Sequence, residues 1–287
     1  MKILILGGDG MLGHQLFRQW MGRHAVTAAV RGSLDSYVHF ELFDRDNCID
    51  KVDVRAVDDV LACVAKVRPD AIVNAVGLIK QRTGSDAALP SLELNSVFPH
   101  RLALIADGVG ARVIHLSTDC VFSGYKGQYI ESDTPDAKDI YGCTKLLGEL
   151  HYPHCLTLRT SIVGRELSRK ASLVEWFLSQ RGRVKGFARA IYTGFTTLEM
   201  ARILENVLVA HPKAHGLWHV SSEPISKYDL LCLLRKYFAL DITVERDNEF
   251  VCDRSLVSDR FRKQFSYHPP SWDQMIKELA GDKDFYQ

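Results

Sequence analysis

The feature that most constrains the fold of this 287-residue sequence is an apolar segment that runs directly into a glycine-rich turn. Residues 2–6, Lys-Ile-Leu-Ile-Leu, are typical of a buried strand, and residues 14–22 have the spacing of a helix. Between them stands Gly-x-x-Gly-x-x-Gly, at Gly7, Gly10 and Gly13. This order of strand, turn and helix predicts a dinucleotide-binding βαβ unit, because the glycines permit a tight turn, close approach of the pyrophosphate and packing of helix on strand.

Further apolar segments continue the pattern of strand and helix. Strands are predicted at residues 25–30, 71–77 and 111–116 and from residue 155, and helices at 57–66 and 91–109. The alternation predicts an α/β fold with a Rossmann-type, doubly wound parallel sheet, whose ligands bind at the carboxyl ends of the strands. We expect residues 1–164 to form the NAD(P)-binding domain and residues 165–287 to form mainly a smaller C-terminal substrate lobe, with a strand near 216–221 returning to the sheet.

Residues after the second strand bear on the choice of cofactor. This strand ends in Arg31, and an arginine there can pair with the 2′-phosphate of NADP, whereas an acidic residue would bind the ribose hydroxyl of NAD. We therefore expect NADPH, with NADH as a second option; the alternative is a solvated surface arginine. Asp53, followed by Val54, is a candidate acceptor for the adenine amino group or a neighbour of a helix N-cap. Residues close to a cofactor are also expected at the next strand end: Asn74, Ala75, Val76 and Gly77.

A tyrosine and a lysine one helical turn apart are the candidate catalytic pair. If residues 141–149 are helical, Tyr141 and Lys145 lie on the same helix face. A nearby ammonium favours the phenolate and lowers the pKa of a tyrosine from its usual value near 10, which suits acid–base catalysis. The hydroxyl of Thr118, which follows another strand, can hydrogen-bond the same carbonyl oxygen. A half-buried tyrosine beside a solvated lysine is the alternative.

Composition narrows the functional class. The net charge of +1 gives no indication of a nucleic-acid partner or of binding to an anionic membrane. The seven cysteines are scattered, without Cys-x-x-Cys, and we interpret them as reduced thiols; no metal-ligand cluster is recognised. The opening apolar segment is too short for a signal peptide, and no apolar run is long enough to span a membrane. These features predict a cytoplasmic protein.

Together these motifs resemble the extended short-chain dehydrogenase/reductases, and within them the dTDP-4-dehydrorhamnose reductases. The resemblance covers nearly the whole chain. Its specific segments are residues 7–13, 117–124, 131–135, 141–149 and 158–161. It implies reduction of a nucleotide-activated 4-keto-6-deoxysugar in the synthesis of cell-surface polysaccharide precursors.

The resemblance also implies roles for single residues. Tyr141 would protonate the sugar C4 oxygen, Lys145 would lower the pKa of Tyr141 and bind the nicotinamide ribose, and Thr118 would polarise the carbonyl. Asp119 would contact the substrate. Residues that would line the cofactor are Gly10, Met11, Leu12, Ala75, Val76, Gly77 and Leu116.

Two positions depart from the family pattern. Ile162 stands where relatives often have a tryptophan that stacks on the sugar, and Phe195 replaces a proline. Both belong to the substrate side, so the sugar and its nucleotide stay open, as does a homodimer. Alternative functions are a nucleotide-sugar epimerase or dehydratase, although Cys120 stands where related dehydratases have an acid, and a non-catalytic NADP-binding regulatory subunit.

Overall fold

The computed structural model describes residues 1–78, 88–168 and 170–286, which form two compact units. Unit 1 comprises Met1–Ser117, Lys138–Leu158 and Ala201–Leu217, and unit 2 comprises Thr118–Ala137, Arg159–Met200 and Trp218–Gln287. Each unit therefore contains three separate segments of the chain. The expected division into a cofactor domain at 1–164 and a mainly substrate-binding lobe at 165–287 stays a prediction, because these units are defined by packing and not by ligand binding.

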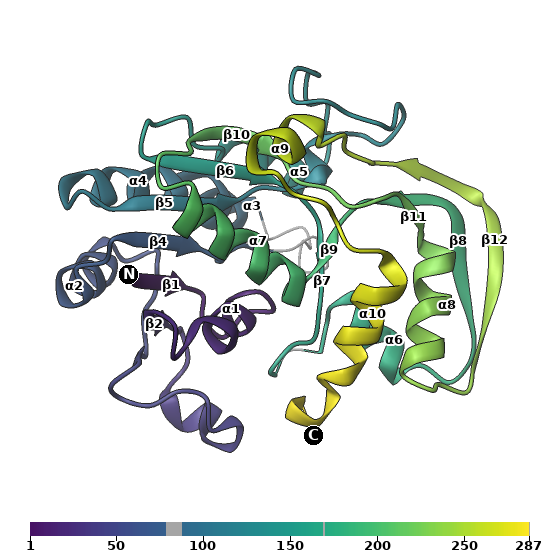
Figure 1. The fold of residues 1–287 in the computed structure, drawn as a ribbon, viewed down its shortest axis with the longest axis horizontal. Helices are drawn as coiled ribbons and strands as arrows, with labels where there is room; N and C mark the ends of the chain where they lie inside the picture. Colours follow the sequence, from purple (N-terminus) through teal and green to yellow (C-terminus); the bar gives the residue numbers. More distant parts are fainter. Residues whose placement is uncertain (79–87, 169, 287) are drawn as a thin grey trace. The chain divides into compact units, whose positions relative to one another are not determined.

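A seven-stranded sheet contains the predicted strands and confirms the Rossmann-type α/β class (Figure 1). Its strand order is β10-β6-β5-β4-β1-β2-β3, and the pairings from β3 to β6 are parallel. The order reverses beside β1, which is the switch point where such sheets bind ligands. The strands are β1 (Lys2–Leu6), β2 (Ala25–Ala29), β3 (Cys48–Ile49), β4 (Ala71–Asn74), β5 (Arg112–Leu116), β6 (Cys155–Arg159) and β10 (Gly216–His219).

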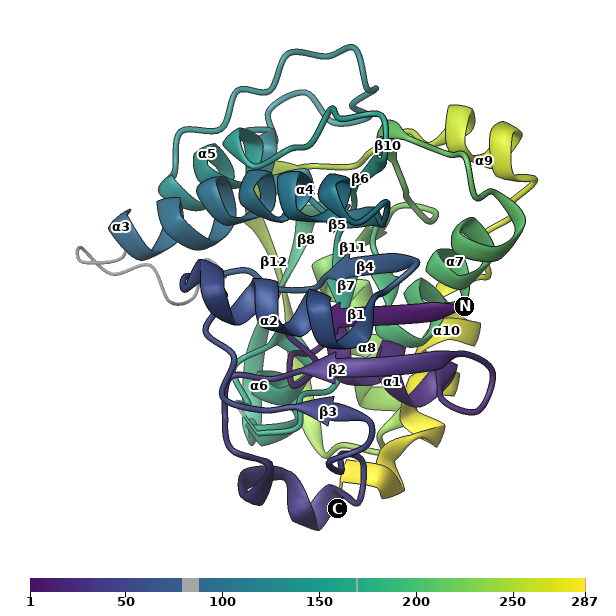
Figure 2. The same cartoon turned by 90° about the vertical axis from the view of Figure 1, so that its left-hand side faces the viewer.

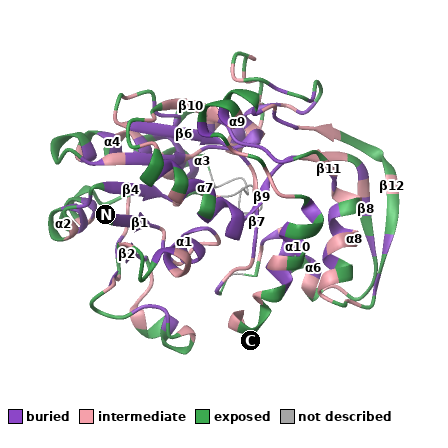
Figure 3. Ribbon diagram, viewed as in Figure 1, coloured by how far each residue is buried: buried purple, intermediate pink, exposed green. Residues whose placement is uncertain are grey.

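Helices cover both faces of this sheet (Figure 2). Leu4 and Leu6 of β1 belong to a buried cluster with residues of α2 and α4, and Trp20 of α1 donates a hydrogen bond to the carbonyl of Ala201 in α7 at 3.1 Å. Because both faces are covered, β1 is almost completely buried after its first residue (Figure 3). The helices around the sheet are α1 (Gly13–Trp20), α2 (Val57–Val67), α4 (Phe98–Gly108), α5 (Ile140–Leu147) and α7 (Thr197–Ala210).

Short helical segments complete the connections. A 3-10 helix, η1 (Leu34–Phe40), follows β2. α3 (Ala88–Ser91) and a π-helical segment, η4 (Leu92–Val97), run directly into α4, so the helix predicted at 91–109 is present with irregular geometry in its first part. A second 3-10 helix, η5 (Asp119–Val121), follows β5 in the chain.

Unit 2 contains a three-stranded sheet that the sequence analysis did not identify. β8 (Gly182–Tyr192) lies between β11 (Ile225–Ser226), which is antiparallel to it, and β12 (Ile242–Asp253), which is parallel. The residues of β8 alternate between buried and exposed over much of the strand. The buried positions include Gly186 and Ala188, which are too small to give a clear hydrophobic signal in the sequence. Also in this unit are β7 (Ile162–Val163), β9 (Phe195–Thr196), α6 (Leu173–Ser179), α8 (Lys227–Tyr237), α9 (Asp259–Phe265), α10 (Trp272–Gly281) and η6 (Lys283–Tyr286).

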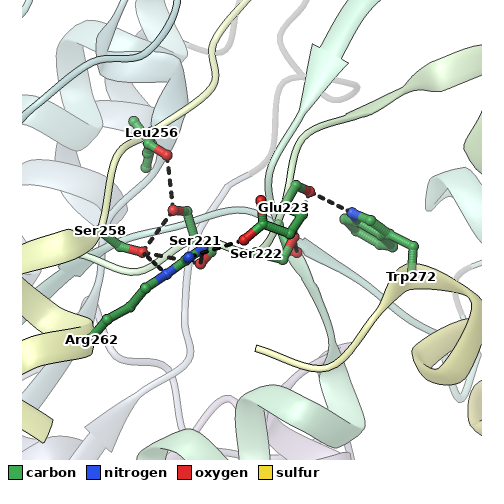
Figure 4. A network of polar contacts seen from close by, with 8 residues as sticks. Ser221, Ser222, Glu223, Leu256, Ser258, Arg262 and Trp272 are labelled. Atoms are coloured by element: carbon green, nitrogen blue, oxygen red, sulfur yellow. Dashed lines mark hydrogen bonds and ion pairs between the residues drawn. The ribbon is translucent and has the colours of Figure 1, made fainter. Parts of the chain in front are cut away.

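A polar network fastens the segment after β10 to α9 and α10 (Figure 4). The Ser221 hydroxyl donates to the carbonyl of Leu256 at 2.8 Å, and Arg262 forms an ion pair with Glu223 at 2.9 Å. The indole of Trp272 donates to the carbonyl of Glu223 at 2.7 Å. Side chains therefore satisfy the hydrogen-bonding capacity of backbone carbonyls here, in a region where the sequence shows weak hydrophobic periodicity.

Candidate active site

The glycine turn after β1 has the geometry that the sequence predicted. Gly7 has a φ of 80°, and its N–H and that of Gly8 both donate to the carbonyl of Ala29 at 3.0 Å. A Cβ atom on Gly13 would lie 2.1 Å from the Gly7 oxygen, so no side chain fits there. α1 begins at Gly13, with Leu12 as an N-cap that offers no side-chain hydrogen bond. The N-terminal N–H groups of α1 thus have no capping side chain, which suits a pyrophosphate.

The segment after β4 packs against this turn. A Cβ atom on Gly7 would lie 3.0 Å from Val76 Cγ2 and 3.2 Å from the Ala75 oxygen. Asn74 is buried, and its side chain accepts from the Val76 N–H at 3.1 Å and contacts His115 Nδ1 at 3.1 Å. Ala75 and Val76 therefore lie beside the glycine turn, and the Asn74 side chain holds the backbone of this segment.

Tyr141 and Lys145 lie one turn apart on α5, which begins after Asp139, whose side chain caps the Gly142 N–H at 3.0 Å. The Lys145 ammonium is buried and donates to the carbonyl of Leu116, at the end of β5, at 2.6 Å. Burial lowers the pKa of Lys145 from 10.5 to about 8, although the charge of Glu149 opposes this change. The lysine is consequently held at a strand end, in a form that still carries its charge at neutral pH.

The helix that carries this pair is shorter than predicted. We expected it to extend to Glu149, but α5 ends at Leu147. Gly148 is the C-cap, and the chain passes η4 at close range there, since a Cβ atom on Gly148 would lie 1.9 Å from the Asn95 oxygen. Glu149 is buried after this turn and accepts a hydrogen bond from the Ser117 hydroxyl at 2.7 Å.

Asn95 connects the segment after β4 with α5, a role that the sequence analysis did not assign. Its side chain accepts from the Leu78 N–H at 2.9 Å and donates to the Thr144 hydroxyl at 3.2 Å. Thr144 is the neighbour of Lys145 in the chain. The signal in the sequence was a polar residue within a predicted helix. In the structure Asn95 is buried in a π-helical segment, a geometry often found at functional sites.

The residues expected near the adenosine end of the cofactor differ in their exposure and in the side chains that they contact. Arg31 is exposed, two residues after the end of β2. Asp53 forms an ion pair with Arg55 at 2.5 Å, and this contact, with a smaller contribution from Arg31, lowers the pKa of the Asp53 carboxyl to about 2. Its carboxylate is therefore already engaged by a neighbouring side chain. Val54, beside it, is half-buried.

Unit 2 carries the remaining predicted residues. Thr118 caps η5: its hydroxyl oxygen accepts from the Cys120 N–H at 3.1 Å and donates to the Asp119 carboxylate at 3.2 Å. Asp119 is buried, which raises the pKa of its carboxyl, while the positive charge of Arg254 opposes the shift. Ile162 is half-buried in β7, which pairs with β9. A polar, buried cluster thus begins directly after the end of β5.

The residues predicted to form the site belong to both units. Thr118, Asp119 and Ile162 belong to unit 2. Unit 1 contains Gly7, Gly10, Met11, Leu12, Gly13, Arg31, Asp53, Val54, Asn74, Ala75, Val76, Gly77, Leu116, Tyr141 and Lys145.

Within the described ranges, no three His, Cys, Asp or Glu side chains are grouped so as to hold a metal ion. Nor does any helix there have the length and apolar character needed to cross a membrane.

Comparison with known proteins identifies a matching family and several similar relatives. The family model described as the RmlD substrate binding domain matches residues 1–283. A dTDP-4-dehydrorhamnose reductase of Aggregatibacter actinomycetemcomitans is 27% identical over 247 residues, covering 79% of this chain and 76% of the relative. Methionine adenosyltransferase 2 subunit beta of Pongo abelii is 30% identical over 264 residues, covering 83% of this chain and 72% of the relative.

A similar fold is found among solved structures. The dTDP-4-dehydrorhamnose reductase of Bacillus anthracis str. Ames, determined in complex with NADP, has a TM-score of 0.79 and 20% sequence identity. The match covers 98% of each chain. At this level of identity the likeness concerns the fold.

Proposed function

Because the chain belongs to the RmlD substrate binding domain family, we propose that it is an NAD(P)H-dependent reductase of a nucleotide-activated 4-keto-6-deoxysugar. The product would be a precursor of a cell-surface polysaccharide, made in the cytoplasm. The observation that carries the proposal is the pair on α5: Tyr141, and one turn later a buried Lys145 whose ammonium is bound to the end of β5. Such a pair suits proton transfer to a carbonyl oxygen.

The residues of unit 1 fit a bound dinucleotide. The pyrophosphate would lie on the backbone of Gly10, Met11 and Leu12, where a glycine turn meets the start of α1. Ala75, Val76, Gly77 and Leu116 would line the path of the cofactor. When bound, the reduced nicotinamide supplies the hydride that adds to C4 of the sugar.

Side chains would supply the proton that the reaction consumes and stabilise the charge that its loss leaves behind. Tyr141 would donate its phenolic proton to the C4 oxygen as that oxygen gains negative charge, so that the ketone becomes an alcohol and the tyrosine a phenolate. Lys145 would stabilise this phenolate through its positive charge and bind the nicotinamide ribose hydroxyls. Thr118 would donate a hydrogen bond to the same sugar oxygen. A positioned acid typically contributes about 10² to 10⁴-fold to the rate.

We place the sugar nucleotide on residues of unit 2. Asp119 would accept hydrogen bonds from sugar hydroxyls, and Ile162 would contact the sugar ring; both belong to unit 2. Cys120 argues against a dehydratase, because burial and the charge of Asp119 raise the pKa of its thiol to about 12. A thiol with that pKa is a poor substitute for the acid that dehydration needs.

The test is a coupled assay of the purified protein. A nucleotide-sugar dehydratase would supply a dTDP- or UDP-linked 4-keto-6-deoxyhexose, and NADPH consumption would be followed by absorbance. Consumption that requires the keto sugar and gives a reduced sugar nucleotide supports the proposal. Failure with both nucleotides, despite measurable NADPH binding, would contradict it.

A second function is favoured by one observation, the 30% identity to a methionine adenosyltransferase beta subunit. In this case the chain would bind the dinucleotide and associate with a larger enzyme without reducing a sugar. Size-exclusion chromatography with a methionine adenosyltransferase catalytic subunit distinguishes the two functions. A stable complex together with no keto-sugar turnover would favour the regulatory function.

A further inference from the structure

An acidic residue lies inside the glycine turn, in addition to the arginine that follows β2. Asp9 stands between Gly8 and Gly10. The turn is tied to the end of β2, because the Gly8 N–H donates to the carbonyl of Ala29 at 3.0 Å and a Cβ atom on Gly8 would lie 2.7 Å from Ala28 Cβ. In this fold the adenosine ribose is recognised at the end of that strand. Asp9 thus belongs to the ribose end of the cofactor site.

A buried tyrosine fixes the position of this carboxylate. The hydroxyl of Tyr37, in η1, donates to Asp9 Oδ2 at 2.9 Å. Tyr37 is buried and packs edge-on against Phe43, with ring centroids 5.7 Å apart. A carboxylate has about four acceptor sites, so the hydrogen bond from Tyr37 does not exhaust its capacity.

The same tyrosine places the carboxylate beside the residue that follows Arg31. A Cβ atom on Gly32 would lie only 2.6 Å from the Tyr37 hydroxyl oxygen. The phenol therefore lies close to the backbone of Gly32 while it donates its hydrogen bond to the Asp9 carboxylate. A group bound near Arg31 would meet a fixed negative charge as well as the positive charge of the arginine.

Other carboxylates reinforce the negative potential of this region. Burial raises the pKa of the Cys48 thiol to about 12, and the charges of Asp50, Asp9 and Asp44 contribute in that order. Asp50 also accepts a hydrogen bond from the Leu34 N–H, at the start of η1, at 3.1 Å. A 2′-phosphate would add negative charge to this acidic surrounding, whereas a 2′-hydroxyl would bring only a hydrogen-bond donor.

We infer that Asp9, oriented by Tyr37, sets the preference between NADH and NADPH by accepting a hydrogen bond from the ribose 2′-hydroxyl and repelling a 2′-phosphate. The inference rests on the proposed dinucleotide site and adds a residue that opposes Arg31. The two residues together give a site that accepts both cofactors, with a ratio decided by the balance of their charges.

The experiment measures dissociation constants for NADH and NADPH by calorimetry, without any sugar. For Asp9→Asn we expect NADPH affinity to rise relative to NADH by about tenfold, because the amide removes the negative charge. Tyr37→Phe should move the ratio in the same direction by a smaller factor, because the carboxylate loses its orientation. Asp46→Asn, which removes an exposed acid from the same unit, is the matched control and should leave the ratio unchanged.

The outcomes separate this inference from the proposed function. If the wild-type protein binds neither dinucleotide, the cofactor site itself is refuted. If both bind and Asp9→Asn leaves their ratio at the wild-type value, the inference is overturned while the proposed function stands. Should Asp9→Asn fail to fold, Tyr37→Phe decides: an unchanged ratio, or a shift towards NADH, overturns the inference.

Discussion

The ammonium of Lys145 is buried and donates a hydrogen bond to the backbone carbonyl of Leu116 at 2.6 Å. This contact joins α5 to the end of β5, one residue before Ser117 and two before Thr118. Burial removes much of the water that would otherwise solvate the charge, and this lowers the pKa of Lys145 to about 8. A lysine in this state can support a phenolate at neutral pH and lose that ability in mild alkali.

The first prediction concerns pH. Lys145 has a lowered pKa, so it is charged below about pH 8 and neutral above it. We expect kcat/KM to fall as the pH rises through about 8, because the ammonium that stabilises the phenolate is lost. In Lys145→Ala, cofactor binding should weaken and residual activity should peak at higher pH. An identical pH profile in wild type and variant would remove the proposed role of the lysine.

The second prediction concerns the buried carboxylate near Lys145. Glu149 raises the pKa of Lys145 against the effect of burial. Glu149→Gln removes that charge, so the alkaline decline of kcat/KM should move to lower pH, by up to about one unit, equivalent to ~1.4 kcal/mol. Ser117→Ala is the control, because it removes the hydrogen bond to Glu149 but keeps its charge. Equal shifts in the two variants would show that the charge is not responsible.

The third prediction concerns the glycine turn. A methyl group on Gly13 would collide with the Gly7 oxygen, so Gly13→Ala must displace the turn. We expect a loss of about 1–3 kcal/mol in the free energy of unfolding and a large loss of NADPH affinity. Gly108→Ala, in α4, introduces a methyl group into open space and serves as control. Denaturant unfolding and calorimetric titration measure both effects, and normal NADPH binding by Gly13→Ala would refute the fingerprint.

A fourth prediction concerns Arg31. This side chain is exposed after β2, at the strand end where the ribose is recognised. Arg31→Ala should weaken NADPH binding far more than NADH binding, because only NADPH carries the 2′-phosphate. Lys66→Ala removes an exposed positive charge from α2 of the same unit and should leave the ratio unchanged. A similar loss for both dinucleotides in Arg31→Ala would contradict the assignment.

Regular patterns allowed much of unit 1 to be predicted from the sequence. The glycine spacing, β1, α2 and the pairing of Tyr141 with Lys145 depend on local rules that leave a clear signal. The features of unit 1 that the sequence did not reveal depend on tertiary contacts. At the end of α5, Gly148 lies close to Asn95, and in the glycine turn Asp9 accepts a hydrogen bond from Tyr37; both contacts join residues that are distant in the chain.

The sheet of unit 2 was missed for a different reason. β12 contains Glu245, Arg246, Asp247 and Glu249 and resembles a solvated loop in composition. It is nevertheless a strand, because its backbone pairs with β8 over most of its length. Pairing between segments far apart in the chain does not require strong hydrophobic alternation when one face is largely exposed.

The most direct test of the central claim is the rate of keto-sugar reduction by Tyr141→Phe, measured beside the dissociation constant of NADPH. Tyr125→Phe, which alters an 88% exposed tyrosine, is the matched control. We predict that Tyr141→Phe binds NADPH normally while kcat falls by about 10² to 10⁴-fold, because the phenyl ring cannot donate a proton. Turnover by Tyr141→Phe close to that of Tyr125→Phe would contradict the assignment of Tyr141 as the acid.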